Sequence, residues 1–398
     1  MEEWKEYKLG DVLSEKGYIR GPFGSALKRG DLISEGIPVY EQQHAIYNKR
    51  DFRFYISEDK YNEMKRFTVY PDDIIISCSG TVGEVSLIKK EDPQGIISQA
   101  LLLLRANNNI ILPSYLLYFF KTTIGHNAIT SRSTGSVQVN IARREIIEDI
   151  PLYLPCIDGQ RKIVSILKSL DDKIECNRRI NDNLEQQAQA LFKSWFVDFE
   201  PFRDGEFVES ELGMIPKGWR VDRIENFCDV FTGRKNVNES TAEGNYPFFS
   251  CSPTNTYSND FVYDGEVVLI AGNGSYTGRT SYYIGKFDLY QRTYACVMKK
   301  DVSKEMSAFV YFMMKCFFEP QKMGGTRGSS IPYIVMNDIT LQCFPFNNEI
   351  VMRFSRIAYD ILLKTFENEQ ESRRLASLRD SLLPKLMSGE IKVGDVTL

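Results

Sequence analysis

The chain has 398 residues, of which 43% are hydrophobic and 26% charged, and its formal net charge is −4. Such a length provides two or three domains with cores of their own. The small net charge excludes a chain that its overall field draws to nucleic acid or to a membrane, so any nucleic-acid site has to be a local patch.

The sequence contains no recognisable targeting or membrane segment. Residues 1–6 are acidic and lack the apolar stretch of a signal peptide. The apolar run 96–104 is shorter than the ~20 residues that a membrane helix needs, and it contains Ser98 and Gln99. The eight cysteines include no Cys-x-x-Cys pair, which is typical of reduced thiols. We therefore expect a soluble, cytoplasmic protein.

The first half is predicted to be a mixed α/β globule, 1–155, followed by a long central helix, 156–199. Apolar residues recur at alternating three- and four-residue spacing, which is typical of a helix that pairs with another helix. An ordinary amphipathic helix on a globular core is the alternative. Amides in the middle of this seam cost stability but can fix the register. The seam residues are Ile163, Leu167, Leu170, Ile174, Asn177, Asn181, Leu184 and Leu191.

The second half repeats this plan. An acidic, turn-rich linker, 200–218, leads to a second globule, 219–345, and then to a second long helix, 346–389, with a tail, 390–398. The seam of this helix also has a polar centre, so the two helices can lay their polar centres against each other. Its seam residues are Ile350, Phe354, Ile357, Ile361, Asn368, Leu375, Leu378 and Leu382.

Motifs recur in the two halves in one order and at nearly one offset, which indicates an internal duplication. Tyr263 opens a turn and β-rich run 193 positions after its counterpart Tyr70. We therefore predict an α+β protein of two repeated mixed α/β globules, each followed by a long helix that pairs with the other. The matching segments are 70–76 with 263–269, 79–83 with 274–278, 97–101 with 289–293, 115–121 with 309–315, and 134–138 with 327–331.

Residues for catalysis or metal binding are scarce. The chain has two histidines, His44 and His126, and no Gly-x4-Gly-Lys-Ser/Thr loop for a nucleotide phosphate. The segment 272–278 weakly resembles a dinucleotide loop, but a tight turn explains its glycines better. No Asn/Asp-Pro-Pro-aromatic motif of amino-methyltransferases occurs. We therefore expect no catalytic, cofactor-binding or metal site in this chain.

Polar loop residues on both globules are the remaining candidates for a site. Arg, Lys, Gln and Asn side chains hold phosphates and read base edges, although each of these residues taken singly fits a solvated surface loop equally well. The DNA-binding candidates are Lys28, Arg29, Gln42, Gln43, His44, Arg50, Arg132, Gln138 and Arg143 in the first globule, and Arg234, Lys235, Asn236, Asn273, Tyr276, Arg279, Arg292, Arg327 and Ser329 in the second.

Four segments together resemble one protein family, the specificity subunits of type I restriction–modification systems. Gln160–Val164 opens the first helix and Ala190–Pro201 ends it, Leu378–Ile391 ends the second helix, and Gly21–Lys28 lies in the first globule. The resemblance extends over essentially the whole chain. It is most specific at the helix ends and least specific in the globules.

The resemblance implies that each globule reads one half of a bipartite, asymmetric DNA site. The two helices would form an antiparallel coiled coil that sets the spacing and docks two methyltransferase subunits, which recruit the restriction subunits. The chain itself would not be an enzyme. S-adenosylmethionine, ATP and magnesium would bind to the partner subunits rather than to this chain.

Two alternatives remain open on the residues alone. One is a duplicated coiled-coil adaptor that binds proteins without DNA recognition, and the other is a fused enzyme, which the missing motifs disfavour. Salt-dependent binding to duplex DNA would distinguish a DNA-recognition protein from the adaptor. Binding of S-adenosylmethionine by the isolated chain would support the fused enzyme.

Overall fold

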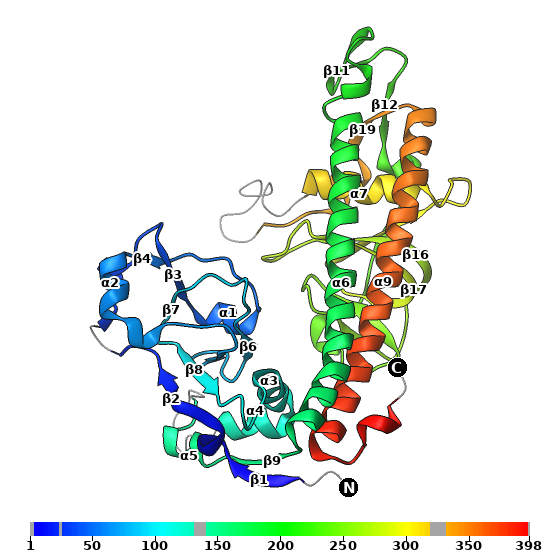
Figure 1. Ribbon diagram of the computed structural model, residues 1–398. Helices are drawn as coiled ribbons and strands as arrows, with labels where there is room; N and C mark the ends of the chain where they lie inside the picture. Colours follow the sequence, from blue (N-terminus) through cyan, green and yellow to red (C-terminus); the bar gives the residue numbers. More distant parts are fainter. Residues whose placement is uncertain (1–3, 24–25, 131–140, 319–331, 397–398) are drawn as a thin grey trace. The chain divides into compact units, whose positions relative to one another are not determined.

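The computed structural model describes residues 4–23, 26–130, 141–318 and 332–396, and the chain divides into two compact units (Figure 1). Unit 1 contains residues 1–173 and 374–398, and unit 2 contains residues 174–373. Each unit combines a sheet-rich globule with parts of two long helices, which confirms the predicted α+β fold class. The boundary between the units crosses both long helices, so neither helix forms a region separate from the globules.

The long helices are α6 (Ile157–Phe196) and α9 (Asn348–Ser388), and they run side by side and antiparallel. Asn177 donates a side-chain hydrogen bond to the Glu371 carboxylate at 2.7 Å, and Asn368 donates one to the side-chain oxygen of Asn181 at 2.8 Å. Residues later in α6 therefore contact residues earlier in α9, as expected for an antiparallel pair. These four residues, which we call the polar layer, lie in the middle of the helix pair.

The buried face of α9 differs in part from its predicted seam. Ile357 and Leu378 are 44% and 40% exposed, so these two seam predictions are wrong. Ile357 lies in unit 2, where α9 packs on α7 as well as on α6 and buries a wider face that includes Val351, Ala358 and Leu362. Leu378 lies in unit 1, outside this contact. The predicted seam residues that are buried are Ile163, Leu167, Leu170, Asn177, Phe354 and Asn368, and those that are half-buried are Ile174, Asn181, Leu184, Leu191, Ile350, Ile361, Leu375 and Leu382.

The globule of unit 1 is built on a four-stranded sheet in the order β2-β8-β5-β6, with a smaller sheet β4-β3-β7 and the terminal pair β1-β9. Its strands are β1 (Lys5–Lys8), β2 (Leu13–Arg20), β3 (Ile37–Tyr40), β4 (Tyr55–Ile56), β5 (Ile74–Ser77), β6 (Val85–Leu87), β7 (Ile96–Ile97), β8 (Leu101–Ala106) and β9 (Pro151–Leu154). Its helices are α1 (Gln42–Ile46), α2 (Glu58–Glu63), α3 (Pro113–Lys121), α4 (Thr123–Ile129) and α5 (Arg144–Glu148).

The leucine run in β8 is explained by burial on both faces. Leu102 and Leu104 pack in one core with Tyr115 of α3, and Leu101 and Leu103 pack in a second core on the opposite face. Successive side chains of a strand point to opposite faces, so a strand covered on both sides needs apolar residues at every position.

The globule of unit 2 has a six-stranded sheet in the order β13-β18-β16-β17-β14-β15 and a terminal pair β12-β19. Its strands are β12 (Arg220–Arg223), β13 (Cys228–Thr232), β14 (Tyr246–Phe249), β15 (Thr256–Ser258), β16 (Tyr263–Ala271), β17 (Thr280–Leu289), β18 (Thr293–Met298) and β19 (Cys343–Phe346). Its helices are α7 (Met306–Phe318) and α8 (Met336–Thr340).

The two globules share one topology. The order β2-β8-β5-β6 of unit 1 corresponds to β13-β18-β16-β17 of unit 2, and in both units all these neighbours are antiparallel. A parallel pair follows in each, β3 with β7 and β14 with β17, and a terminal antiparallel pair closes each globule. The duplication inferred from the sequence motifs is thus a duplication of the fold.

Residues 200–218, predicted to be a linker, contain a β-hairpin instead. Strands β10 (Phe207–Ser210) and β11 (Gly213–Pro216) pair antiparallel, and Gly213 has a φ of 88°, which a glycine adopts without strain. Ile215 is buried in the core of unit 2. The turn-rich composition of this segment reflects a tight hairpin that belongs to the globule.

Candidate nucleic-acid interface

In unit 1, the turns that follow β2, β3 and β5 and the turn that precedes β8 lie together at one end of the sheet, which we call the loop edge. Gly21 donates its backbone N–H to Leu101 at 2.9 Å, Ser98 to Tyr40 at 2.8 Å, and Cys78 to Ala100 at 2.9 Å. A Cβ atom on Gly21 would lie 1.9 Å from the carbonyl oxygen of Ser98, so only glycine permits this approach. The chain leaves β2 and β3 at this edge, where it also enters β8.

Unit 2 builds a loop edge in the same way. A Cβ atom on Gly233 would lie 1.6 Å from the carbonyl oxygen of Leu289. The N–H of Gln291 donates to Lys235 at 3.0 Å, and the N–H of Gly272 donates to Arg292 at 2.8 Å. The corresponding turns of the duplicated fold therefore converge in both units.

The loop edge of unit 1 contains a recess of about 590 Å³, which we call the Gln42 recess. Four of its lining residues each carry a buried side-chain atom that has no hydrogen-bond partner in the described protein: Arg20 Nη1, Glu41 Oε2, Gln42 Oε1 and Ser98 Oγ. Phe23, 68% exposed, lies at its side, with the Arg20 guanidinium 5.7 Å from the ring centre. The lining residues are Arg20, Phe23, Glu41, Gln42, Gln43, Arg53, Ser79, Ser98, Gln99 and Ala100.

A second, more open recess of about 500 Å³ shares Arg20 with the first. Arg66, Arg143 and Arg144 also line it, so several guanidinium groups gather along this part of unit 1. Arg144 is paired with Glu148 at 2.8 Å, and beside the Gln42 recess Arg53 is paired with Glu41 at 2.7 Å. Planar guanidinium groups bind phosphate oxygens in bidentate fashion.

Two predicted DNA contacts of unit 1 face the interior instead. His44 is buried; its Nδ1 accepts the backbone N–H of Glu41 at 2.7 Å, and its Nε2–H donates to the carbonyl of Asp51 at 3.0 Å. Burial lowers the pKa of His44 below its ordinary value, so the ring is neutral near pH 7. His44 therefore fixes the shape of α1 and cannot reach a ligand.

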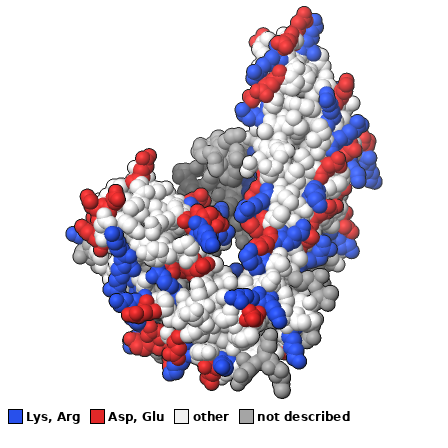
Figure 2. Space-filling view, in the orientation of Figure 1, with Lys and Arg blue, Asp and Glu red and all other residues white. Residues whose placement is uncertain are grey.

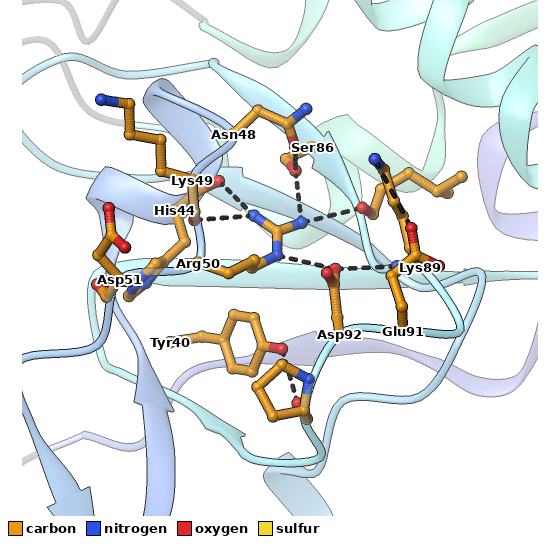
Figure 3. A network of polar contacts seen from close by, with 12 residues as sticks. Tyr40, His44, Asn48, Lys49, Arg50, Asp51, Ser86, Lys89, Glu91 and Asp92 are labelled. Carbon is orange, nitrogen blue, oxygen red and sulfur yellow. Dashed lines mark hydrogen bonds and ion pairs between the residues drawn. The ribbon is translucent and has the colours of Figure 1, made fainter. Parts of the chain in front are cut away.

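Arg50 also has an internal role (Figure 3). Its Nε donates to the carboxylate of Asp92 at 2.7 Å, and that carboxylate is 7% exposed. The remaining guanidinium N–H groups donate to Ser86 Oγ and to the carbonyls of Leu87, His44 and Lys49 at 3.0 to 3.1 Å. The guanidinium is fully engaged in holding the α1 region on the sheet, so Arg50 is a structural residue.

The other candidates of unit 1 have different environments. Gln42 and Gln43 line the Gln42 recess, and Arg143 lines the second recess. Lys28 and Arg29 are exposed on a short turn outside both recesses. Arg132 and Gln138 lie outside the described residues, as do Arg327 and Ser329 of the second half.

In unit 2, two of the candidates are engaged in internal contacts. Lys235 forms an ion pair with Asp288 at 2.7 Å, and the hydrogen bond to that carboxylate raises the pKa of Lys235. Arg279 donates to the carbonyl of Ser252 at 2.6 Å, and burial lowers the pKa of its guanidinium. Among the others, Arg234, Asn236, Tyr276 and Arg292 are exposed and Asn273 is half-buried.

Several residues at the loop edge of unit 1 were missed by the sequence analysis. Arg20 lies at the end of β2, and Ser98 and Gln99 lie just before β8. Gln99 belongs to a repeated motif, since Gln291 occupies the matching position in unit 2. That repetition, together with a basic residue beside a required glycine, was the available signal. The other missed residues are Phe23, Arg53 and Arg66.

The described residues contain no cluster of three or more His, Cys, Asp or Glu side chains that could hold a metal ion. Within the same residues, no helix is both long enough and apolar enough to cross a membrane. Figure 2 shows Lys and Arg next to Asp and Glu along α6 and α9, where Arg178 bonds Glu175 and Asp182 within one helix. Such pairs are typical of a solvated helix face.

A family model described as the type I restriction modification DNA specificity domain matches residues 1–186 and 216–345. The chain is 26% identical over 307 residues to the type I restriction enzyme MjaIX specificity subunit of Methanocaldococcus jannaschii, covering 72% of the chain and 71% of that protein. It is 23% identical over 478 aligned positions to the HindI specificity subunit of Haemophilus influenzae, covering 98% of the chain and 100% of that protein.

The fold is similar to a crystal structure of the S subunit of a type I restriction–modification system from M. genitalium. The TM-score is 0.55 at 16% identity, and the superposition covers 96% of each chain. At this identity the likeness concerns the fold, and it agrees with the duplicated architecture described above.

Proposed function

Because the chain belongs to the family of type I restriction–modification DNA specificity proteins, we propose that it is the DNA specificity subunit of such a system. Each unit reads one half of a bipartite, asymmetric site in double-stranded DNA. The observation that carries this proposal is the loop edge, which the duplicated fold builds twice from matching turns but furnishes with different side chains.

The residue types at the two loop edges suit DNA. Unit 1 presents Arg20, Gln42 and Gln99, and unit 2 presents Arg234 and Arg292. Arginine and glutamine can form paired hydrogen bonds with base edges in the major groove, and arginine also holds phosphates. A net charge of −4 over the whole chain places the attraction for DNA in these local groups.

The paired helices α6 and α9 set the spacing between the half-sites and dock two methyltransferase subunits, through which restriction subunits join. The polar layer of Asn177, Asn181, Asn368 and Glu371 supports this role, because polar groups in a helix seam fix one register. A fixed register gives a fixed length of spacer.

The chain contributes recognition, and the chemistry is performed by its partners. S-adenosylmethionine, ATP and magnesium bind to the partner subunits in this proposal, and the subunit acts in the cytoplasm. We expect the isolated chain to show neither methylation nor cleavage, and the assembled complex with methyltransferase subunits to methylate adenine. Methylation by the purified chain alone would contradict the assignment.

A domain exchange tests the division of labour between the units. Residues 219–345 are replaced with the corresponding globule of a relative, and genomic methylation is mapped in cells that also express the methyltransferase subunits. We expect one half of the methylated motif to change and the other half to stay as it was. If both halves change, or if neither does, the modular assignment is wrong. A protein-binding adaptor would give no sequence-specific methylation at all.

A further inference from the structure

We propose that the Gln42 recess of unit 1 receives the major-groove edges of purine bases, with Arg20 and Gln42 as the residues that determine specificity there. This inference rests on the proposed function and makes it specific, because it assigns base contacts to two side chains out of a large polar surface.

The first observation is the concentration of unpaired polar atoms. Across the described residues, eleven buried side-chain nitrogen or oxygen atoms have no hydrogen-bond partner in the protein, and four of them belong to residues that line this recess. Buried polar groups are paired in the great majority of cases, since an unpaired group costs free energy. Donors and acceptors left unpaired on one concave surface are what a ligand with a polar edge requires.

The second observation is the chemistry of these groups. An arginine guanidinium matches the N7 and O6 acceptors of guanine, and a glutamine amide matches N7 and the amino group of adenine. Arg20 presents an unpaired donor and Gln42 an unpaired acceptor. Glu41 is less suited to contact a base, because its other carboxylate oxygen is held by Arg53 at 2.7 Å. The exposed ring of Phe23 offers an apolar surface beside them.

The third observation is that both residues are mounted on rigid backbone. Gly21 fits against Ser98 with no room for a side chain, which fixes the end of β2 just after Arg20. Gln42 begins α1, whose geometry is fixed by the two hydrogen bonds of His44 and by the donation from Arg50 to the His44 carbonyl. His44 and Arg50 are therefore positioning residues for Gln42. Side chains held in this way lose little conformational freedom on binding.

The test uses the full chain assembled with its methyltransferase subunits and duplexes carrying the methylated motif. Each base pair of the half-site read by unit 1 is substituted in turn, and affinities are measured at one salt concentration. The wild-type complex is expected to discriminate at each specified position. For Gln42→Ala, discrimination should fall by about 5- to 150-fold at an adenine position and stay unchanged elsewhere. Arg20→Lys keeps the positive charge but loses the paired donors of the guanidinium, so discrimination should fall by a similar factor at a guanine position.

Lys49→Ala is the matched control, because Lys49 is exposed and only its backbone carbonyl takes part in the Arg50 network. Its discrimination should equal that of the wild type. If Gln42→Ala and Arg20→Lys discriminate as the wild type does, or if they weaken binding equally to every duplex, the recess does not read bases, although the proposed function stands. If the wild-type complex itself fails to discriminate, the proposed function fails. Should Gln42→Ala melt early in a thermal scan, Arg20→Lys decides the question alone.

Discussion

The two globules share one strand topology but differ in the hydrogen bonding of the side chains at their loop edges. In unit 1, Arg20, Gln42 and Ser98 each leave a buried polar atom unpaired around a recess. In unit 2, the corresponding turns are bonded to one another: Gln291 donates to Asn236 at 2.5 Å, and Cys251 donates to the carbonyl of Arg292 at 3.3 Å. The duplicated backbone thus carries unpaired polar groups around a recess in unit 1 and polar side chains bonded between neighbouring turns in unit 2.

This difference indicates where the stability of each unit comes from. Unit 1 holds its edge through the interior ion pair of Arg50 and Asp92, away from the recess. Unit 2 holds its edge through Lys235 and Asp288, which lie within the edge itself. Variants in these two pairs therefore compare an ion pair beneath the loop edge in unit 1 with an ion pair inside the loop edge in unit 2.

The largest effect is expected for Arg50→Met. This change leaves the carboxylate of Asp92, 7% exposed, without its cation, and it should lower the free energy of unfolding of unit 1 by about 3–5 kcal/mol. Lys235→Met should cost less, roughly 1–3 kcal/mol, because Ser258 still donates to Asp288 at 2.7 Å. Urea unfolding with separate fluorescence probes in each unit measures both, with exposed Lys49→Met as the control. Equal losses would remove the proposed contrast between the units.

The shared frame is tested by the matched pair Gly21→Ala and Gly233→Ala. A Cβ atom would lie 1.9 Å and 1.6 Å from a backbone carbonyl oxygen, so each should cost about 1–3 kcal/mol or more through forced displacement of neighbouring strands. Gly30→Ala is the control, since nothing lies within 4 Å of its added Cβ atom. Thermal unfolding of the three variants shows whether the units respond alike. A large loss in one unit alone would mean that the frames are not equivalent.

The helix segments of the two units can be compared through their polar contacts. Asn368→Ala removes the donor for Asn181 in unit 2, and we expect a loss of roughly 1–2 kcal/mol. Arg379→Ala removes the contact with Asp171 in unit 1, where both side chains are 25% exposed, so about 1 kcal/mol is expected. Double-mutant cycles with Asn181→Ala and Asp171→Ala measure each coupling. A coupling near zero for Asn368 with Asn181 would argue against the polar layer as a register device.

The smallest effect is a pH dependence of the stability of unit 1 that comes from the buried His44. Burial lowers the pKa of His44, so below the ordinary histidine pKa of about 6.5 the unfolded chain binds the proton more readily than the folded one. The stability is complete above that pH and is lost as the pH falls through the lower pKa of the folded state. Unfolding curves at pH 7.5 and 5.5 should differ less for His44→Gln than for the wild type, whereas the exposed control Lys49→Met should retain the wild-type difference.

The sequence predicted the long helices and the duplicated fold well, because the spacing of apolar residues along the chain follows their burial. The heptad spacing predicted the long helices, and the repeated motifs predicted two copies of one fold. The leucine run of β8 is a different case, since periodicity shows that it is buried but not what covers it. Each of its two covering cores combines nearby residues, such as Tyr115 and Ile97, with residues from distant segments of the chain.

The loop residues were predicted less well, because the direction of a loop side chain depends on tertiary contacts. His44 and Arg50 looked like ligand-binding residues, yet their partners Asp51 and Asp92 hold them inside. Arg20 was overlooked because it ends a strand. The exposure of Ile357 has the same origin: the heptad assumes one partner for α9, and unit 2 supplies a second one in α7.

The close approach at Gly21 and Gly233 also determines which changes the protein can accumulate. These two positions reject any side chain, whereas Arg234 and Arg292 beside them are exposed. In a saturation library scored for expression, the two glycines should be the least tolerant positions of the loop edges, and Gln42, Arg234 and Arg292 should accept many residues. New DNA sequence preferences can then arise through side-chain substitutions at the loop edge while the strands stay unchanged. A whole globule can likewise be exchanged between relatives that share the strand topology.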